Sequence, residues 1–412
     1  MTSAEAPPVA LYVHVPFCVS HCPYCDFVVV AGRAARGPAN RIAAFVAALE
    51  VELALRADAL DARWGPPGHG PGVRPPLDSL YFGGGTPSLV PASEIGRLVS
   101  IVRARFGLAA GAEVTLEVNP GPDERGDAAA FRSAGVTRMS IGAQSFDQAE
   151  LRRLGRRHGP GDVAATIAQA RAGGIASISL DLLYDVPDQS LDGWAATLDA
   201  ALALAPDHLS LYALTLDDPD AEGLTGVAGD HLPVRAGARR WRDGARAAQD
   251  ENLAAAMYEL ADSRLAAAGF AWYEISNWAL PGHRSRHNLA YWQAKAHEAV
   301  GPGAHAFDGV TRRWNAARLD AWLAALVPAD GSPARLPPGG RDAQAAPVRA
   351  ADAAILALRT DGGLAATALD SPTLGGPLAW ALGARLLERS ADRLVLTRSG
   401  RLLSNELFAR LV

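Results

Sequence analysis

Cys18-Val19-Ser20-His21-Cys22-Pro23-Tyr24-Cys25 is the stretch that restricts the fold and chemistry of this chain most strongly. The chain has 3 cysteines, and all lie in this segment with the spacing CxxxCxxC. An odd, tight group of cysteines is a poor disulfide framework and more often binds metal or does redox chemistry. An iron–sulfur cubane normally has four thiolate ligands, so three would leave one iron open to an outside molecule. A zinc site of three cysteines and His21 is the simpler alternative.

Six segments have the pattern of buried parallel strands, and each is followed by a stretch long enough for a helix. They are residues 10–15, 79–82, 114–118, 138–144, 178–184 and 208–214. Right-handed crossovers curl such a sheet towards a barrel, but a closed barrel needs eight units. The sequence therefore predicts an α/β fold, an open (β/α)6 partial TIM barrel, with the site at the carboxyl ends of the strands.

The 412 residues exceed what one compact domain usually holds. We expect the core domain over residues 1–223, then an exposed insertion over residues 224–249, which are rich in Gly, Arg and Asp. Residues 250–331 are expected to join the core to the tail, and the Pro- and Gly-rich residues 332–347 to form a linker. Residues 348–412 are expected to form a smaller C-terminal helical or winged-helix-like domain.

The composition argues against several classes of protein. The net charge is −5 and no basic stripe is present, which argues against nucleic-acid binding, including a winged-helix DNA reader in the tail. No apolar stretch has the length of a membrane span, and the first residues do not have the pattern of a signal peptide. We therefore expect a cytoplasmic protein without a membrane span.

Polar residues recur where the predicted strands end. The second strand runs into Gly83-Gly84-Gly85-Thr86-Pro87, where glycine would let the backbone approach a ligand. Glu117, Gln144, Arg156 and Asp181 lie on or near later strands. A charge inside an apolar strand is costly unless it is paired or liganded. Taken singly, these are an ordinary turn and solvated strand ends; taken together, they could hold a zwitterionic, sugar-bearing ligand.

Longer motifs carry a family resemblance. They are residues 11–18 (LYVHVPFC), 81–88 (YFGGGTPS), 140–146 (SIGAQSF) and 273–277 (YEISN). With the cysteine spacing, they resemble the radical-SAM superfamily and, within it, the family of oxygen-independent coproporphyrinogen III oxidase (HemN) and its relatives. The resemblance implies a [4Fe–4S] cluster on Cys18, Cys22 and Cys25 that binds S-adenosylmethionine (SAM) through its open iron. It implies SAM contacts at Tyr12, Tyr24, Gly84, Gly85, Thr86, Glu117, Gln144, Arg156 and Asp181.

Two features indicate a branch of this family. True oxidases resemble CxxxCxxCxC and carry a longer N-terminal segment, whereas this chain has Phe27 at the last position. His287-Asn288-Leu289-Ala290-Tyr291-Trp292 resembles the HNxxYW motif of HemW-type heme chaperones. The resemblance therefore implies heme as cargo, handed to apo-hemoproteins that include respiratory ones. The alternative hypothesis is oxidative decarboxylation of coproporphyrinogen III. A third hypothesis is a radical enzyme that acts on an unrelated substrate. Whether the chain is an enzyme stays open.

The HNxxYW motif supplies the heme-binding candidates His287, Tyr291 and Trp292. A neutral imidazole can ligate heme iron, and the two aromatic rings can stack on a macrocycle. His283, His297 and His305 lie nearby in sequence and could share this task. In the alternative, His287 hydrogen-bonds locally while Tyr291 and Trp292 pack the domain junction.

Overall fold

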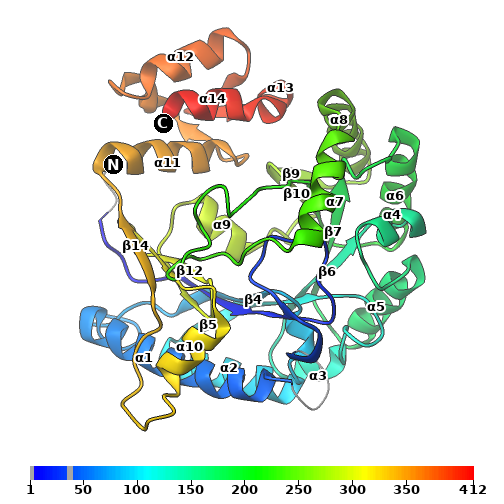
Figure 1. Cartoon of the computed structure of the whole chain (residues 1–412). Helices are drawn as coiled ribbons and strands as arrows, with labels where there is room; N and C mark the ends of the chain where they lie inside the picture. The colour runs from blue at the N-terminus through cyan, green and yellow to red at the C-terminus, as the bar shows by residue number, and fades with distance from the viewer. Residues whose placement is uncertain (1–3, 35–39) are drawn as a thin grey trace.

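The computed structural model describes residues 4–34 and 40–412 (Figure 1). Its main feature, within these residues, is a twelve-stranded sheet. The strands, in spatial order, are β14 (Gly339–Ala343), β13 (Thr311–Asn315), β12 (His305–Phe307), β11 (His297–Val300), β1 (Ala10–Val15), β4 (Leu77–Gly84), β5 (Leu108–Val118), β6 (Arg138–Gln144), β7 (Ser177–Tyr184), β8 (His208–Ala213), β10 (Asn277–Ala279) and β9 (Ala271–Glu274).

The predicted partial barrel is confirmed. Strands β1, β4, β5, β6, β7 and β8 are the six predicted strands, and they pair in parallel in chain order. Strand β11 pairs in parallel with β1, and the remaining strands extend both sides antiparallel. The order is linear, with β14 and β9 at its two edges, so the barrel stays open. The carboxyl ends of the parallel strands therefore meet on one side, as expected.

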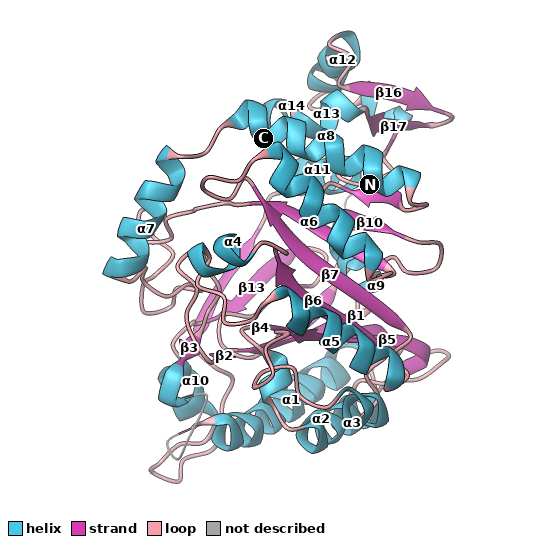
Figure 2. Ribbon diagram, turned by 90° about the vertical axis from the view of Figure 1, so that its right-hand side faces the viewer, coloured by secondary structure: helices cyan, strands magenta, loops and turns pink. Residues whose placement is uncertain are grey.

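Helices cover the outer face of this sheet (Figures 1 and 2). They bury apolar side chains against the strands, and the shared core includes Phe82, Leu116, Ile141 and Leu180, all fully buried. Their bounds are α1 (Ile42–Trp64), α2 (Ala92–Arg105), α3 (Ala128–Ser133), α4 (Gln148–Arg153), α5 (Pro160–Ala172) and α6 (Leu191–Ala203), with short 3₁₀ turns η1 (Gly32–Ala34) and η2 (Pro87–Leu89). No helix in the described ranges is long and apolar enough to cross a membrane.

The chain beyond residue 223 departs from three expectations. It contains α7 (Ala236–Ala247), α8 (Glu251–Ala267), α9 (Arg286–Trp292) and α10 (Leu319–Leu326), and it adds six strands to the same sheet. Helices α8 and α10 pack into the core of the barrel. The expected border at residue 223 therefore does not divide the sheet. Residues 224–249 are not wholly exposed, because Ala238, Arg242 and Ala245 on α7 are buried. Residues 332–347 are not only a linker, since β14 pairs with β13.

The C-terminal domain has a hydrophobic core of its own. It contains α11 (Ala346–Leu358), α12 (Gly375–Gly383), α13 (Arg398–Leu402), α14 (Ser404–Leu411), η3 (Ala366–Asp370) and a small antiparallel sheet of β15 (Leu364–Ala365), β17 (Arg393–Leu396) and β16 (Leu387–Ser390). In both ribbon views this domain lies at one end of the barrel sheet (Figures 1 and 2). Helices around a small three-stranded sheet agree with the predicted winged-helix-like tail.

Candidate functional site

The cysteine loop leaves the barrel directly after β1. Cys18 ends the short strand β2 (Phe17–Cys18), which pairs in parallel with β3 (Val30–Ala31), so the two strands close the loop that holds Cys22 and Cys25. Burial raises the pKa of the Cys18 thiol to about 12, and burial followed by repulsion from Cys22 raises that of Cys25 further. Thiolates at these positions therefore need nearby positive charge, which a bound metal centre supplies.

Arg242 on α7 fixes the backbone of this loop. Its guanidinium donates to the carbonyls of Pro23 (3.1 Å), Tyr24 (3.0 Å) and Cys25 (2.9 Å). It also donates to the Asp217 carbonyl (2.6 Å), and the residue is only 4% exposed. The planar, five-donor fork of arginine suits such multiple acceptors. This role could not be predicted from the sequence, because Arg242 lies more than 200 positions away in a segment expected to be exposed.

A cavity of about 350 Å³ opens beside the cysteine loop at the strand ends. The three cysteines line it together with Tyr24, Gly84, Gly85, Glu117, Gln144, Arg156 and Asp181. The structure thus brings together the cysteines and seven of the nine expected SAM-contacting residues. Tyr12 instead lines a second cavity, and Thr86 bonds to the Cys18 sulfur (Oγ1 to Sγ, 3.3 Å).

Gly84 and Gly85 serve close packing within the protein. Gly84 has φ +110°, and a Cβ there would lie 2.5 Å from Cε1 of His14. At Gly85 a Cβ would lie 2.6 Å from the carbonyl oxygen of Phe17. The backbone amides of Gly85 and Thr86 donate to Val15 and Phe17. The glycines therefore let the carboxyl end of β4 lie against the start of the cysteine loop. This role differs from the close approach of a ligand that the motif suggested.

Two carboxylates face the same cavity from neighbouring parts of the sheet. Glu117 accepts from Tyr81 Oη and the Gly84 amide, both at 2.9 Å. Ser140 Oγ lies 3.1 Å from both oxygens of Asp181. Burial raises the pKa of Glu117 to about 7 and that of Asp181 to about 6, and repulsion from Asp181 contributes to the Glu117 shift. This end of the cavity attracts a cation or a hydroxyl donor.

Arg156 brings positive charge to the cysteine side of the cavity. Its guanidinium donates to Asn119 Oδ1 (2.6 Å) and the Gly142 carbonyl (2.8 Å), and it lies 3.8 Å from the Cys22 sulfur.

Two further polar residues lie at strand ends beside Arg156. Gln144, at the end of β6, has φ 66°, a backbone conformation that a non-glycine residue seldom adopts and that often occurs at functional sites. Asn119, two positions after Glu117, was missed by sequence reasoning, although its place just past a strand end could have marked it.

The three aromatic side chains proposed from the HNxxYW motif, His287, Tyr291 and Trp292, lie in different surroundings. His287 is 1% exposed, and both ring nitrogens are engaged, Nδ1 with Ser79 Oγ (2.9 Å) and Nε2 with Tyr291 Oη (2.8 Å). Burial lowers the pKa of His287 to about 3. Trp292 lies under the Arg359 guanidinium, 4.6 Å from the ring centroid. Tyr291 alone of the three lines a cavity. His287 as an iron ligand stays a prediction, but its position agrees with the local-bonding alternative.

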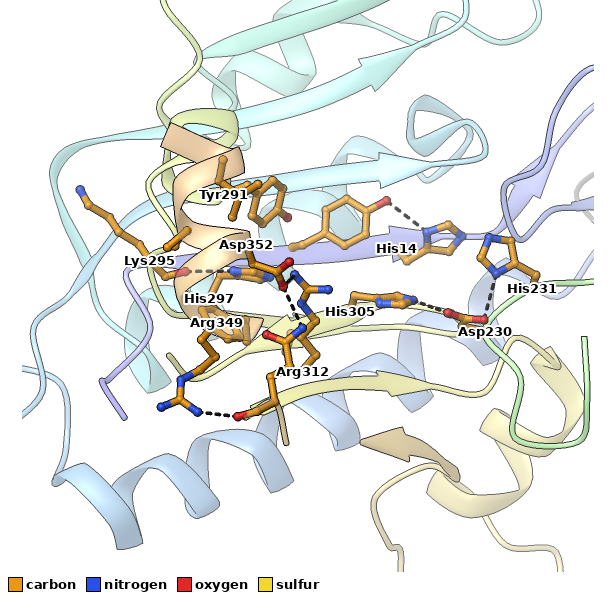
Figure 3. Close-up of a pocket in the computed structure, with 18 of the residues that line it drawn as sticks. His14, Asp230, His231, Tyr291, Lys295, His297, His305, Arg312, Arg349 and Asp352 are labelled. Carbon is orange, nitrogen blue, oxygen red and sulfur yellow. Dashed lines mark hydrogen bonds and ion pairs between the residues drawn. The ribbon is translucent and has the colours of Figure 1, made fainter. Parts of the chain in front are cut away.

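That second cavity, of about 670 Å³, lies between the barrel sheet and α11 (Figure 3). It shares Asp26 and Phe27 with the cavity at the cysteines, so the two are neighbours. Phe27 is 61% exposed on this shared wall. Of the other histidines near the motif, His297 and His305 line this cavity, whereas His283 bonds to Ser177 Oγ at 3.0 Å.

An open parallel βα barrel with a three-cysteine loop and a polar cavity at its strand ends defines a radical-SAM protein. The Radical SAM superfamily model matches residues 71–201. Coproporphyrinogen III oxidase (HemN) from Escherichia coli, a radical SAM enzyme, has the same fold, with a TM-score of 0.77 at 21% identity over 98% of this chain and 90% of that chain.

Similarity over most of the sequence defines the family. The chain is 38% identical over 398 residues to the heme chaperone HemW of Mycobacterium tuberculosis (strain ATCC 25618 / H37Rv), covering 97% of this chain and 93% of that protein. It is 36% identical over 301 residues to the heme chaperone HemW of Escherichia coli (strain K12), covering 73% and 70%. The chain belongs to the HemW family.

Proposed function

We propose that the protein is a heme chaperone on a radical-SAM scaffold, which binds heme and delivers it to apo-hemoproteins. The observation that carries the proposal is the identity to a heme chaperone across nearly the whole length of both chains. Phe27 supports it, because a fourth cysteine of the oxidase pattern is absent from the sequence. Respiratory hemoproteins as acceptors, and the cytoplasm as the location, belong to the same proposal.

The proposed resident group is a [4Fe–4S] cluster on Cys18, Cys22 and Cys25, with SAM at its open iron. It would supply one-electron chemistry at the sulfonium of SAM. Its fit rests on Cys18 and Cys25, whose raised thiol pKa values mean that thiolates there need a positive partner, and on the loop that Arg242 holds by its carbonyls. The chain's own part is to keep three sulfurs on one side of a cavity and leave the other side to SAM.

The cavity side chains have the chemistry that a zwitterionic nucleoside requires. Arg156 would meet the methionine carboxylate, while Glu117 and Asp181 would accept from the ammonium or the ribose hydroxyls. Tyr24, Gln144 and the backbone at Gly84 and Gly85 would contact the rest of the molecule. Tyr12 and Thr86 would act indirectly, since Tyr12 bonds to His14 Nδ1 (3.1 Å) and Thr86 to Cys18.

The test uses the full chain, reconstituted anaerobically with iron and sulfide. One sample receives hemin and then an apo-hemoprotein; we expect a stoichiometric Soret band that moves to the acceptor on mixing. A second sample receives SAM, a reductant and coproporphyrinogen III; we expect no protoporphyrinogen at useful turnover. Oxidation of the porphyrinogen, or failure to bind and release hemin, would overturn the chaperone proposal.

A further inference from the structure

The larger cavity has the volume and the mainly apolar lining of a site for a cofactor-sized molecule. Helix α11 turns Ala350 and Ala353 towards it and packs Ala351, Ala354 and Leu358 on its opposite face into the C-terminal core. Ala350 and Ala353 are exposed, whereas Ala351, Ala354 and Leu358 are buried. Sites of several hundred Å³ with mainly apolar walls at domain junctions are typical of cofactor-sized ligands.

Imidazoles held by one carboxylate lie on one side of this cavity. Asp230 bonds to His231 Nδ1 through one oxygen and to His305 Nε2 through the other, both at 2.9 Å (Figure 3). Within the described residues, no hydrogen bond uses His231 Nε2 or His305 Nδ1. An imidazole whose second nitrogen is held by a carboxylate is the usual arrangement of a metal-ligating histidine.

This group suits a metal that brings most of its own ligands. Among the described residues, no three His, Cys, Asp or Glu side chains converge on a single metal ion. Heme iron needs only one protein imidazole, since the macrocycle fills four positions.

Cations lie at the other end of the cavity. Lys295, Arg312 and Arg349 line it there, away from Asp230 (Figure 3). Arg312 pairs with Asp352 (2.7 Å), and Arg349 bonds to the backbone of Gln344. Lys295 is exposed and is the one lysine of the chain, which otherwise uses arginine at its basic positions. Three cations beside an apolar slot suit a flat ligand with carboxylates on one edge.

We infer that this cavity between the barrel sheet and α11 is the site of the heme cargo. The macrocycle lies against the alanine face of α11 and Phe27, with its propionates at Lys295, Arg312 and Arg349. His231 or His305, each held by Asp230, ligates the iron. The inference rests on the proposed function and names its site, which is not at His287.

The single lysine makes a direct footprint possible. The reconstituted full chain is acetylated with an amine-reactive reagent, with and without one equivalent of hemin, and Lys295 is quantified by mass spectrometry. The α-amino group is the internal reference. Hemin, and iron-free protoporphyrin IX as well, should lower Lys295 acetylation several-fold while the reference reaction is unchanged.

Variants separate the propionate end, the slot and the iron ligand. The triple variant Lys295→Gln/Arg312→Gln/Arg349→Gln should bind hemin at least about tenfold more weakly, the value of one charge-assisted hydrogen bond. Ala353→Trp should block hemin while the fold is kept, since its side chain enters open space. The exposed Arg389 on β16 gives the control Arg389→Gln, which should bind as the unmodified chain does.

The iron ligand is read from the Soret band of bound hemin. His231→Ala or His305→Ala should shift or weaken it, whereas His287→Gln, which keeps hydrogen-bonding atoms, should not. Unchanged Lys295 acetylation together with full binding by the triple and Ala353→Trp variants would overturn this site while leaving the heme chaperone in place. A chain that binds no hemin at all would remove both the site and the proposed function.

Discussion

At the scale of single residues, Arg242 shows how a remote side chain can control the cysteine loop. Arg242→Ala removes the donors of four backbone carbonyls in a buried setting, which should cost about 2–5 kcal/mol of stability. In this variant, we expect the amounts of iron and sulfide bound per chain after anaerobic reconstitution to fall. Arg240→Ala, an exposed site on the same helix, is the control, and equal iron contents in both variants would contradict the role.

Gly84 is fixed by sterics as well as by its backbone angle. In Gly84→Ala the new methyl would meet the His14 ring, and φ +110° is unfavourable for alanine. We expect destabilisation of about 2–4 kcal/mol, measured by urea unfolding of the cluster-free protein. Gly237→Ala on α7 meets nothing within 4 Å and should be neutral or slightly stabilising. Similar midpoints for the two variants would refute the packing argument.

Glu117 ties stability to pH in an unusual direction. Its pKa in the folded protein, about 7, exceeds its ordinary value of 4.5, so the folded state binds more protons between these values. Its contribution is complete below pH 4.5 and is lost as pH rises to 7, roughly 1–3 kcal/mol for this partly buried group. Asp181→Asn removes the second cause and should lower the Glu117 pKa, but burial, the first cause, keeps it above 4.5. Carboxyl NMR titration measures this, and an unmoved Glu117 pKa would exclude the coupling.

At the scale of elements, the six parallel strands were predictable because each is a short apolar run with a helix-length segment after it. The strands added on both sides, β9 to β14, were not predictable, because they are three to five residues long and their sequence pattern resembles that of loops. The glycine motif, Glu117 and Asp181 could be assigned to one cavity, since parallel strand ends meet on one side. Tyr12 could not, because β1 also pairs with β11, an unpredicted strand whose His297 lines the larger cavity.

The junction between α8 and the C-terminal domain depends on one buried carboxylate. Asp262 is 6% exposed and accepts from Arg398, Arg401 and Trp278 at 2.9–3.1 Å. Asp262→Ala leaves these donors unpaired, so we expect a loss of about 3–5 kcal/mol and faster amide exchange in α13 and α14. Asp199→Ala breaks an exposed pair with α8 and should cost less than about 1 kcal/mol. Equal exchange in both variants would show that this cluster does not hold the domain.

At the scale of the whole molecule, two cavities of different chemistry meet at Asp26 and Phe27. One contains the thiols, two carboxylates and Arg156, and the other has mainly apolar walls with imidazoles and cations at its ends. Their walls are otherwise formed by different residues, since α11 and β12 contribute only to the larger one. In the proposed arrangement, SAM would occupy the cavity at the cysteines and heme would occupy the larger cavity, next to the cysteine loop but not inside it.

The division predicts that the two ligands bind almost independently. The triple variant Cys18→Ser/Cys22→Ser/Cys25→Ser should lose the iron–sulfur absorption but keep hemin binding within about tenfold of the unmodified chain. The reason is that the two cavities have Asp26 and Phe27 in common and otherwise different lining residues. A tenfold change corresponds to a coupling of about 1.4 kcal/mol. Hemin titration of both proteins under argon measures this, with Ala353→Trp as the converse variant that keeps iron–sulfur absorption but loses hemin. Loss of hemin binding in the serine variant, with its fold intact by circular dichroism, would place the cargo on the cluster itself and contradict the two-cavity arrangement.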